Sequence, residues 1–132
     1  MGNKQKGSNA ERELIHLFWA TQKWTALRVA GSGSMNYPSP DVLASNEGIH
    51  LAIECKATIS KSQYLEKREV HELVEFAKKA GARPLIAVRF KRTPWYFLNP
   101  TDLNPTEHHY AISQTEAERR GMTFEEITAK KS

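Results

Sequence analysis

Three charged residues interrupt the most strand-like part of this chain. Asp41 follows a proline in PSPDVLA, and Glu54 and Lys56 are two positions apart in IHLAIECK. Carboxylates are hard oxygen ligands that suit Mg²⁺ or Mn²⁺ better than zinc, and such a cation can polarise a phosphate and activate a water. Lys56 can orient that water or neutralise transition-state charge, and the Cys55 backbone carbonyl can add one more oxygen. The pattern indicates metal-assisted hydrolysis of a phosphodiester.

The same residues have a simpler explanation, because Glu54 and Lys56 can form an i, i+2 ion pair on a solvated edge strand. The register of the hairpin decides between the two readings. If SNEG (45–48) forms a four-residue turn, Asp41 faces Ala52 and shares one sheet face with Glu54 and Lys56. The two acids are then diagonal neighbours with Cα atoms roughly 7–8 Å apart, close enough to share one ion.

Glu11 is a further candidate. The segment SNAERELIHLFWATQKW predicts a helix over residues 8–24 with Ser8 as its N-cap, which explains Glu11 fully as a capping-box carboxylate. Glu11 also aligns with Ile15 and Phe18 at the end of an inward-facing stripe. From there it can reach the metal face of the sheet and hold a water.

Basic and hydroxyl side chains near these acids can contact phosphates. Arg12 follows the helix acid and Arg28 ends a predicted strand, although each taken alone is explained as a surface charge. The loop GSGSMNYPSP precedes the first strand acid. It is either a plain connector or an arm that closes over a nucleic-acid backbone, with Ser32 and Ser34 hydrogen-bonding to phosphate oxygens.

The elements that must position these residues form a mixed pattern. Helical periodicity predicts a second helix over 69–80, closed by Gly81 as its C-cap. Short apolar runs predict strands at 25–29, 41–44, 49–56, 83–90 and 94–100. The order α-β-β-β-α-β-β is typical of an α/β fold with a mixed central β-sheet flanked by helices.

Length and composition bound the class of protein. The 132 residues predict a single domain (1–132), with a mobile basic arm over 1–7 and a tail over 101–132 that holds a short strand and one or two small helices. The first 100 residues carry 15 lysines and arginines against 9 acids, whereas the tail carries 4 against 6, so the body suits a polyanion. The lone Cys55 and the lack of a signal-peptide core or long apolar run predict a reducing cytoplasm and no membrane span.

Five segments in order, GSNAERELI, RVAGSGS, PDVLA, IECK and KREVHELVEFAKKAG, resemble the archaeal-type Holliday junction resolvases, also found in viruses and phages. The likeness covers roughly residues 4–92. It implies a restriction-endonuclease-like fold of the PD-(D/E)xK nuclease superfamily. It also implies a homodimer that nicks two opposing strands of a four-way DNA junction symmetrically, in recombination and repair. The implied cofactor is Mg²⁺, with Mn²⁺ expected to substitute, and no small-molecule cofactor is implied.

The resemblance also assigns residues. The family's metal acids fall on Asp41 and Glu54, its catalytic lysine on Lys56, its helix-one acid on Glu11, its arginines on Arg12 and Arg28, and its catalytic-loop serine on Ser32. The expected DNA contacts are completed by Lys4, Lys6, Ser34, Lys67 and Arg68. The family's dimerisation helix corresponds to 69–80, where Phe76, off the main apolar stripe, would be covered by a second subunit.

Two other functions stay open at this point. One is a nuclease of the same superfamily that acts on nicked, flapped or duplex DNA. The other is a non-catalytic branched-DNA-binding module that keeps the acids as structural ion pairs. The complete set of two acids, a lysine and Glu11 favours catalysis.

Overall fold

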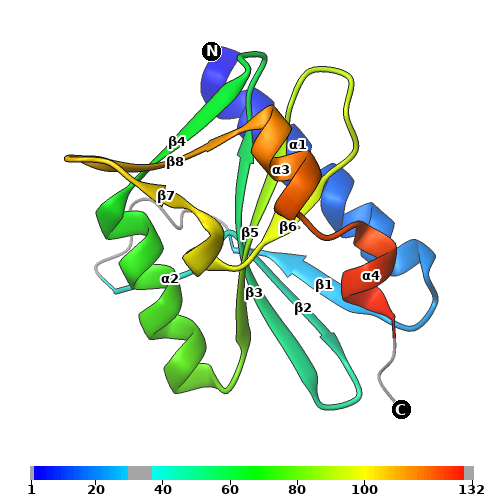
Figure 1. The fold of residues 1–132 in the computed structure, drawn as a ribbon. Coiled ribbons are helices and arrows are strands. Elements are labelled where there is room, and N and C mark those ends of the chain that lie inside the picture. The colour runs from blue at the N-terminus through cyan, green and yellow to red at the C-terminus, as the bar shows by residue number, and fades with distance from the viewer. Residues whose placement is uncertain (1, 30–36, 130–132) are drawn as a thin grey trace.

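A five-stranded mixed sheet forms the centre of the computed structural model, which describes the backbone of residues 2–29 and 37–129 and the side chains of residues 9–29 and 37–129 (Figure 1). In spatial order its strands are β1 (Thr25–Arg28), β2 (Val42–Asn46), β3 (Ile49–Ala57), β5 (Arg83–Arg89) and β6 (Tyr96–Leu98). The central pair β3 and β5 is parallel, and the other pairs are antiparallel. The predicted α/β class with a mixed sheet is confirmed.

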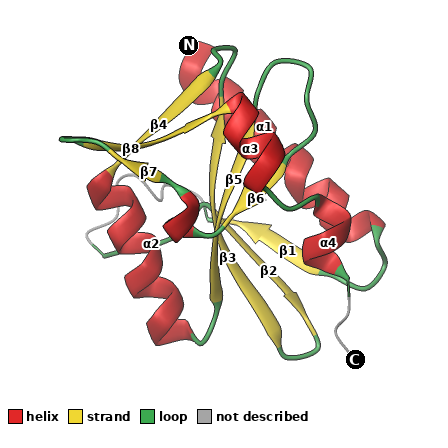
Figure 2. Ribbon diagram, viewed as in Figure 1, coloured by secondary structure: helices red, strands yellow, loops and turns green. Residues whose placement is uncertain are grey.

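Helices cover both faces of this sheet (Figure 2). The helices α1 (Gly2–Ala20) and α4 (Phe124–Thr128) pack on one face, and α2 (Lys67–Ala80) and α3 (Gln114–Arg120) pack on the other. Side chains alternate along β3 as the pleat requires, so Leu51 and Ile53 enter the α1 core and Ala52 enters the α2 core. Within the described ranges, no helix combines the length and apolar character needed to cross a membrane.

A small second sheet lies beside the first. In spatial order it consists of β4 (Ser62–Glu66), β8 (His109–Ser113) and β7 (Asn104–Pro105). A 3-10 helix (Pro100–Asp102) precedes β7 in the chain. The tail strand β8 and helices α3 and α4 match the prediction, whereas β4 was missed. The sequence around β4 is polar, and only Leu65 within it is buried. Its strand conformation depends on pairing with β8, which is distant in the sequence.

The first helix begins earlier than expected. Because α1 starts at Gly2, it includes residues 2–7 of the segment predicted as a basic arm, and Ser8 lies inside the helix and not at its N-cap. The lysines and glutamine of this segment are good helix formers, and they carry the helix through Gly7. Glu11 is therefore not a capping-box residue of α1.

The β2–β3 hairpin has a tighter turn than predicted. Glu47 and Gly48 have φ of 44° and 87°, so two residues close the turn and Asn46 pairs with Ile49. A turn with two left-handed residues matches the twist of the strands better than the expected four-residue turn. The register moves by two residues, which preserves the predicted faces. Asp41, just before Val42, comes to lie beside Glu54 and not opposite Ala52.

Candidate active site

Asp41 lies where the β2–β3 ladder ends, and its side chain continues the hydrogen bonding there. Its backbone N–H donates to the Ile53 carbonyl (3.0 Å), and its carbonyl accepts from the Val29 N–H (2.8 Å). The Cys55 N–H then donates to Asp41 Oδ2 (2.9 Å). Because the N–H and C=O of a strand residue point to the same side, the Cys55 carbonyl also faces this edge. Backbone contacts thus fix one carboxylate at the end of the strand.

Glu54 is the second carboxylate, and it is buried at 8% exposure. Burial, and next the neighbouring Asp41 carboxylate, raise the pKa of Glu54 to about 9, and Lys56 offsets this only in part. The Glu54 carboxyl is therefore protonated at neutral pH, and it lies within hydrogen-bonding reach of Asp41. A simple solvated ion pair with Lys56 does not describe this residue.

Glu11 reaches the same edge from α1. Its Oε1 accepts a hydrogen bond from Arg28 Nε of β1 at 2.9 Å, and both side chains are partly buried. Burial, followed by the charge of Asp41, raises the pKa of Glu11, and Arg28 counteracts part of the shift. Glu11 faces inward as predicted, but α1 covers the sheet face opposite Ala52 and Lys56, so Glu11 approaches Asp41 at the sheet edge and not across the predicted metal face. Arg28 holds this acid in place, in addition to any contact with DNA.

Lys56 lies on the α2 side of β3, with its ammonium bonded to Glu69. Lys56 Nζ donates to Glu69 Oε2 at 2.8 Å. Burial lowers the pKa of Lys56, but the Glu69 hydrogen bond and the surrounding carboxylates outweigh it, so the net shift is upward. Glu69 was not predicted as a site residue. Its only sequence signal is its position three residues after Glu66, which indicates a helix cap and no contact with a distant strand.

The donor set at this edge fits a hard divalent cation. Glu54 retains a proton because it is buried beside the Asp41 carboxylate. A divalent cation between the two would favour the ionised form of both acids. Among the described residues, no three His, Cys, Asp or Glu side chains converge into a ready metal cluster. Such a two-carboxylate site suits Mg²⁺, which usually keeps several waters and substrate phosphate oxygens as its other ligands. Burial and the surrounding carboxylates raise the pKa of the Cys55 thiol, so it is not a thiolate ligand.

The side chains expected to contact phosphates are only partly described. Ser32 and Ser34, and the side chains of Lys4 and Lys6, lie outside the described residues. Arg12 is exposed on α1. Lys67 lies 5.6 Å from the centre of the Tyr110 ring. Arg68 is exposed and pairs with Glu72 (3.2 Å) and with Glu66 (3.8 Å), so nearby acids partly neutralise its charge.

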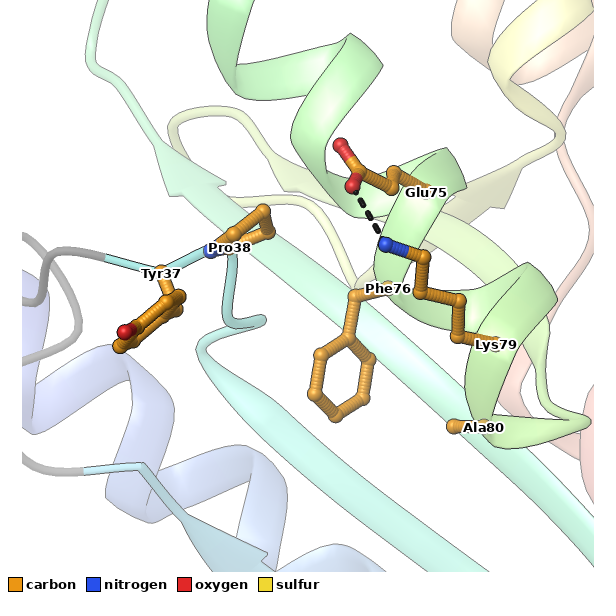
Figure 3. A pocket seen from close by; sticks show the side chains of 6 residues that line it. All are labelled: Tyr37, Pro38, Glu75, Phe76, Lys79 and Ala80. Atoms are coloured by element: carbon orange, nitrogen blue, oxygen red, sulfur yellow. Dashed lines mark hydrogen bonds and ion pairs between the residues drawn. The ribbon is translucent and has the colours of Figure 1, made fainter.

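An apolar hollow lies beside α2 (Figure 3). It is lined by Tyr37, Pro38, Glu75, Phe76, Lys79 and Ala80. The Phe76 ring projects from α2 into the space between the helix and the Tyr37–Pro38 segment. Tyr37 is 77% exposed, and Val74 on the same helix as Phe76 is 40% exposed. This helix therefore presents aromatic and aliphatic surface to solvent beside its charged residues.

Comparison with known proteins gives consistent results. The family model described as archaeal Holliday junction resolvase (Hjc) matches residues 2–132. The crossover junction endodeoxyribonuclease Hjc of Archaeoglobus fulgidus is 38% identical over 112 residues, which cover 85% of this chain and 82% of that protein. The crossover junction endodeoxyribonuclease Hje of Saccharolobus islandicus is 36% identical over 101 residues, which cover 74% of each chain.

The fold is similar to a solved structure of the same class. The crystal structure of Archaeoglobus fulgidus Hjc, a Holliday junction resolvase from an archaeal hyperthermophile, superposes with a TM-score of 0.86 at 33% identity. The superposition covers 93% of this chain and all of that one. The similarity therefore extends into the tail (101–132), beyond the resemblance found over residues 4–92.

Proposed function

The chain belongs to the archaeal Holliday junction resolvase family, and we propose that it is a divalent-metal-dependent endonuclease that resolves four-way DNA junctions. The observation that carries this proposal is the pair of adjacent strand carboxylates, Asp41 and Glu54, with Lys56 two residues further along β3. A rigid sheet edge holds such groups more accurately than a loop would. The proposed nuclease domain is the whole chain, and its compartment is a reducing cytoplasm because Cys55 is the single cysteine.

The proposed cofactor is Mg²⁺, with Mn²⁺ able to substitute. Asp41 and Glu54 would hold it directly through carboxylate oxygens, the Cys55 carbonyl would add a third oxygen, and Glu11 would act through a water. When bound, such a cation polarises the scissile phosphate and lowers the pKa of the water that attacks it.

The remaining residues act around that centre. Lys56 brings a positive charge to the site and stabilises the negative charge that develops on the scissile phosphate. The Arg28 contact orients Glu11 toward Asp41. Basic side chains would hold the branched DNA backbone through phosphate contacts, namely the exposed Arg12 with Lys4, Lys6, Lys67 and Arg68. Recognition would therefore depend on the shape of the DNA more than on its sequence. Ser32 and Ser34 would hydrogen-bond to phosphate oxygens near the cut strand.

The proposed assembly is a homodimer that buries the hollow beside α2. The exposed Tyr37 and Val74 beside the partly buried Phe76 support this, because monomeric proteins seldom leave such patches uncovered. A two-fold dimer would hold two active sites in a fixed relation, and a four-way junction offers two equivalent strands to cut. Paired symmetric nicks in opposing strands follow from this symmetry.

The test uses purified protein with a labelled immobile four-way junction and a linear duplex of the same sequence, in Mg²⁺ or in EDTA. We expect paired nicks in the junction alone, lost in EDTA and in Asp41→Asn. Equal cutting of the linear duplex would instead indicate a general nuclease. Tight junction binding without cutting in either Mg²⁺ or Mn²⁺ would leave only a branched-DNA-binding module.

A further inference from the structure

Glu69 uses both of its carboxylate oxygens. Oε1 accepts from the Glu66 backbone N–H at 3.0 Å, which closes the capping box at the start of α2. Oε2 accepts from Lys56 Nζ at 2.8 Å. The Glu69 side chain is 24% exposed and the Lys56 side chain 26% exposed, so water screens this pair less than a surface pair. A single carboxylate thus joins the first turn of α2 to β3.

The second contact is not needed for helix capping. The helix α4 has the same capping box, in which Glu126 Oε1 accepts from the Thr123 N–H at 2.8 Å. No salt bridge of Glu126 occurs among the described residues, yet its helix is capped in the same way. The contact between Glu69 and Lys56 therefore requires a reason other than the cap.

That reason lies in what the lysine would otherwise contact. Glu54 and Lys56 are two residues apart on one face of β3, so a free ammonium on its four-carbon stem can fold back onto the Glu54 carboxylate. Within the described part of the chain, the hydrogen-bond partner of the ammonium is Glu69 and not Glu54. The ammonium is thereby held at one place, and the Glu54 oxygens are left for another positive charge.

We propose that Glu69 is a positioning residue of the nuclease, which holds the Lys56 ammonium beside the two strand acids and keeps it from occupying the Glu54 carboxylate. The proposal rests on the proposed metal-dependent cleavage of DNA junctions and adds to it a residue on α2. Glu69 contacts no reacting atom and acts through Lys56.

The test compares Glu69→Gln with Glu126→Gln. The amide that replaces the Glu69 carboxylate keeps an oxygen for the Glu66 N–H, but its second group is an N–H₂ that cannot accept from the ammonium. The change in α4 alters the same capping position far from the lysine and serves as the matched control. The measurements are the single-turnover rate of junction cleavage, the junction Kd in EDTA and the melting temperature in EDTA.

We expect Glu69→Gln to lower the cleavage rate on the order of ten-fold, the usual effect of losing one charge-assisted hydrogen bond. Its junction Kd in EDTA should match that of Glu126→Gln, its melting temperature should be lower because the ion pair to Lys56 is lost, and Glu69→Asp should recover part of the rate. Equal cleavage rates in Glu69→Gln and Glu126→Gln would reduce Glu69 to a helix cap and overturn the proposal. An inactive wild-type protein would instead overturn the proposed nuclease function, so the two failures are distinguishable.

Discussion

Glu54 makes the stability of the metal-free protein depend on pH in an unusual direction. Its pKa is 4.5 in the unfolded reference and about 9 in the fold, so between these values the folded chain binds one proton that the unfolded chain does not. The free energy of unfolding must then fall as pH rises through this window. This is the opposite of an ion-paired carboxylate, which stabilises the fold as pH rises.

The magnitude follows from one proton. Each pH unit changes the free energy of unfolding by about 1.4 kcal/mol, so between pH 6 and pH 8 the loss due to Glu54 is roughly 3 kcal/mol. For a domain of this size that corresponds to a decrease in melting temperature of roughly 10 °C. Glu54→Gln removes the titrating group but keeps its shape, so the pH slope of the variant should lack this contribution.

The assay is thermal unfolding in EDTA at pH 6, 7 and 8 for the wild type and Glu54→Gln. Glu107→Gln is the control, because its side chain is 87% exposed and its ion pair within the described residues is a surface contact to His108. Adding Mg²⁺ should stabilise the wild type more at pH 8 than at pH 6, since the cation takes the place of the proton. Identical pH slopes for the wild type and Glu54→Gln would refute the reasoning about this carboxyl pair.

Three further outcomes are expected. If the proposed homodimer forms, Phe76→Asp should convert it to a monomer in sedimentation experiments, because a charge would enter the hollow beside α2, whereas Tyr64→Asp on the second sheet should leave the dimer intact. Gly81→Ala should cost about 1 kcal/mol in urea unfolding, because Gly81 has φ of 68°, a left-handed conformation that alanine disfavours. A Cβ there would meet no atom within 4 Å, so no steric clash adds to this cost, and an unchanged unfolding midpoint would contradict the prediction. Arg12→Ala should weaken junction binding and reduce its salt slope by about 1, and a slope equal to that of the wild type would rule out a phosphate contact.

Much of the fold could be predicted because its signals are local. The period-two alternation of IHLAIECK assigned the apolar β3 side chains to their observed faces, and Gly81 marked the end of α2 correctly. The two-residue error in the hairpin turn left the faces unchanged, because a strand repeats every two residues. The candidate acids could be identified for the same reason, since a charged residue on such a strand is visible in the sequence itself.

The contacts around those acids were decided only by the tertiary structure. The bond from Arg28 to Glu11 joins β1 to α1, and the bond from Lys56 to Glu69 joins β3 to α2. The sequence alone explains Glu11 as a local cap, whereas α1 begins at Gly2. Glu69 has the local pattern of a cap, and it also holds a lysine from another element. A sequence pattern reports how each segment satisfies its own backbone. The packing of one element against another determines which distant side chain donates a hydrogen bond to the second oxygen of a carboxylate.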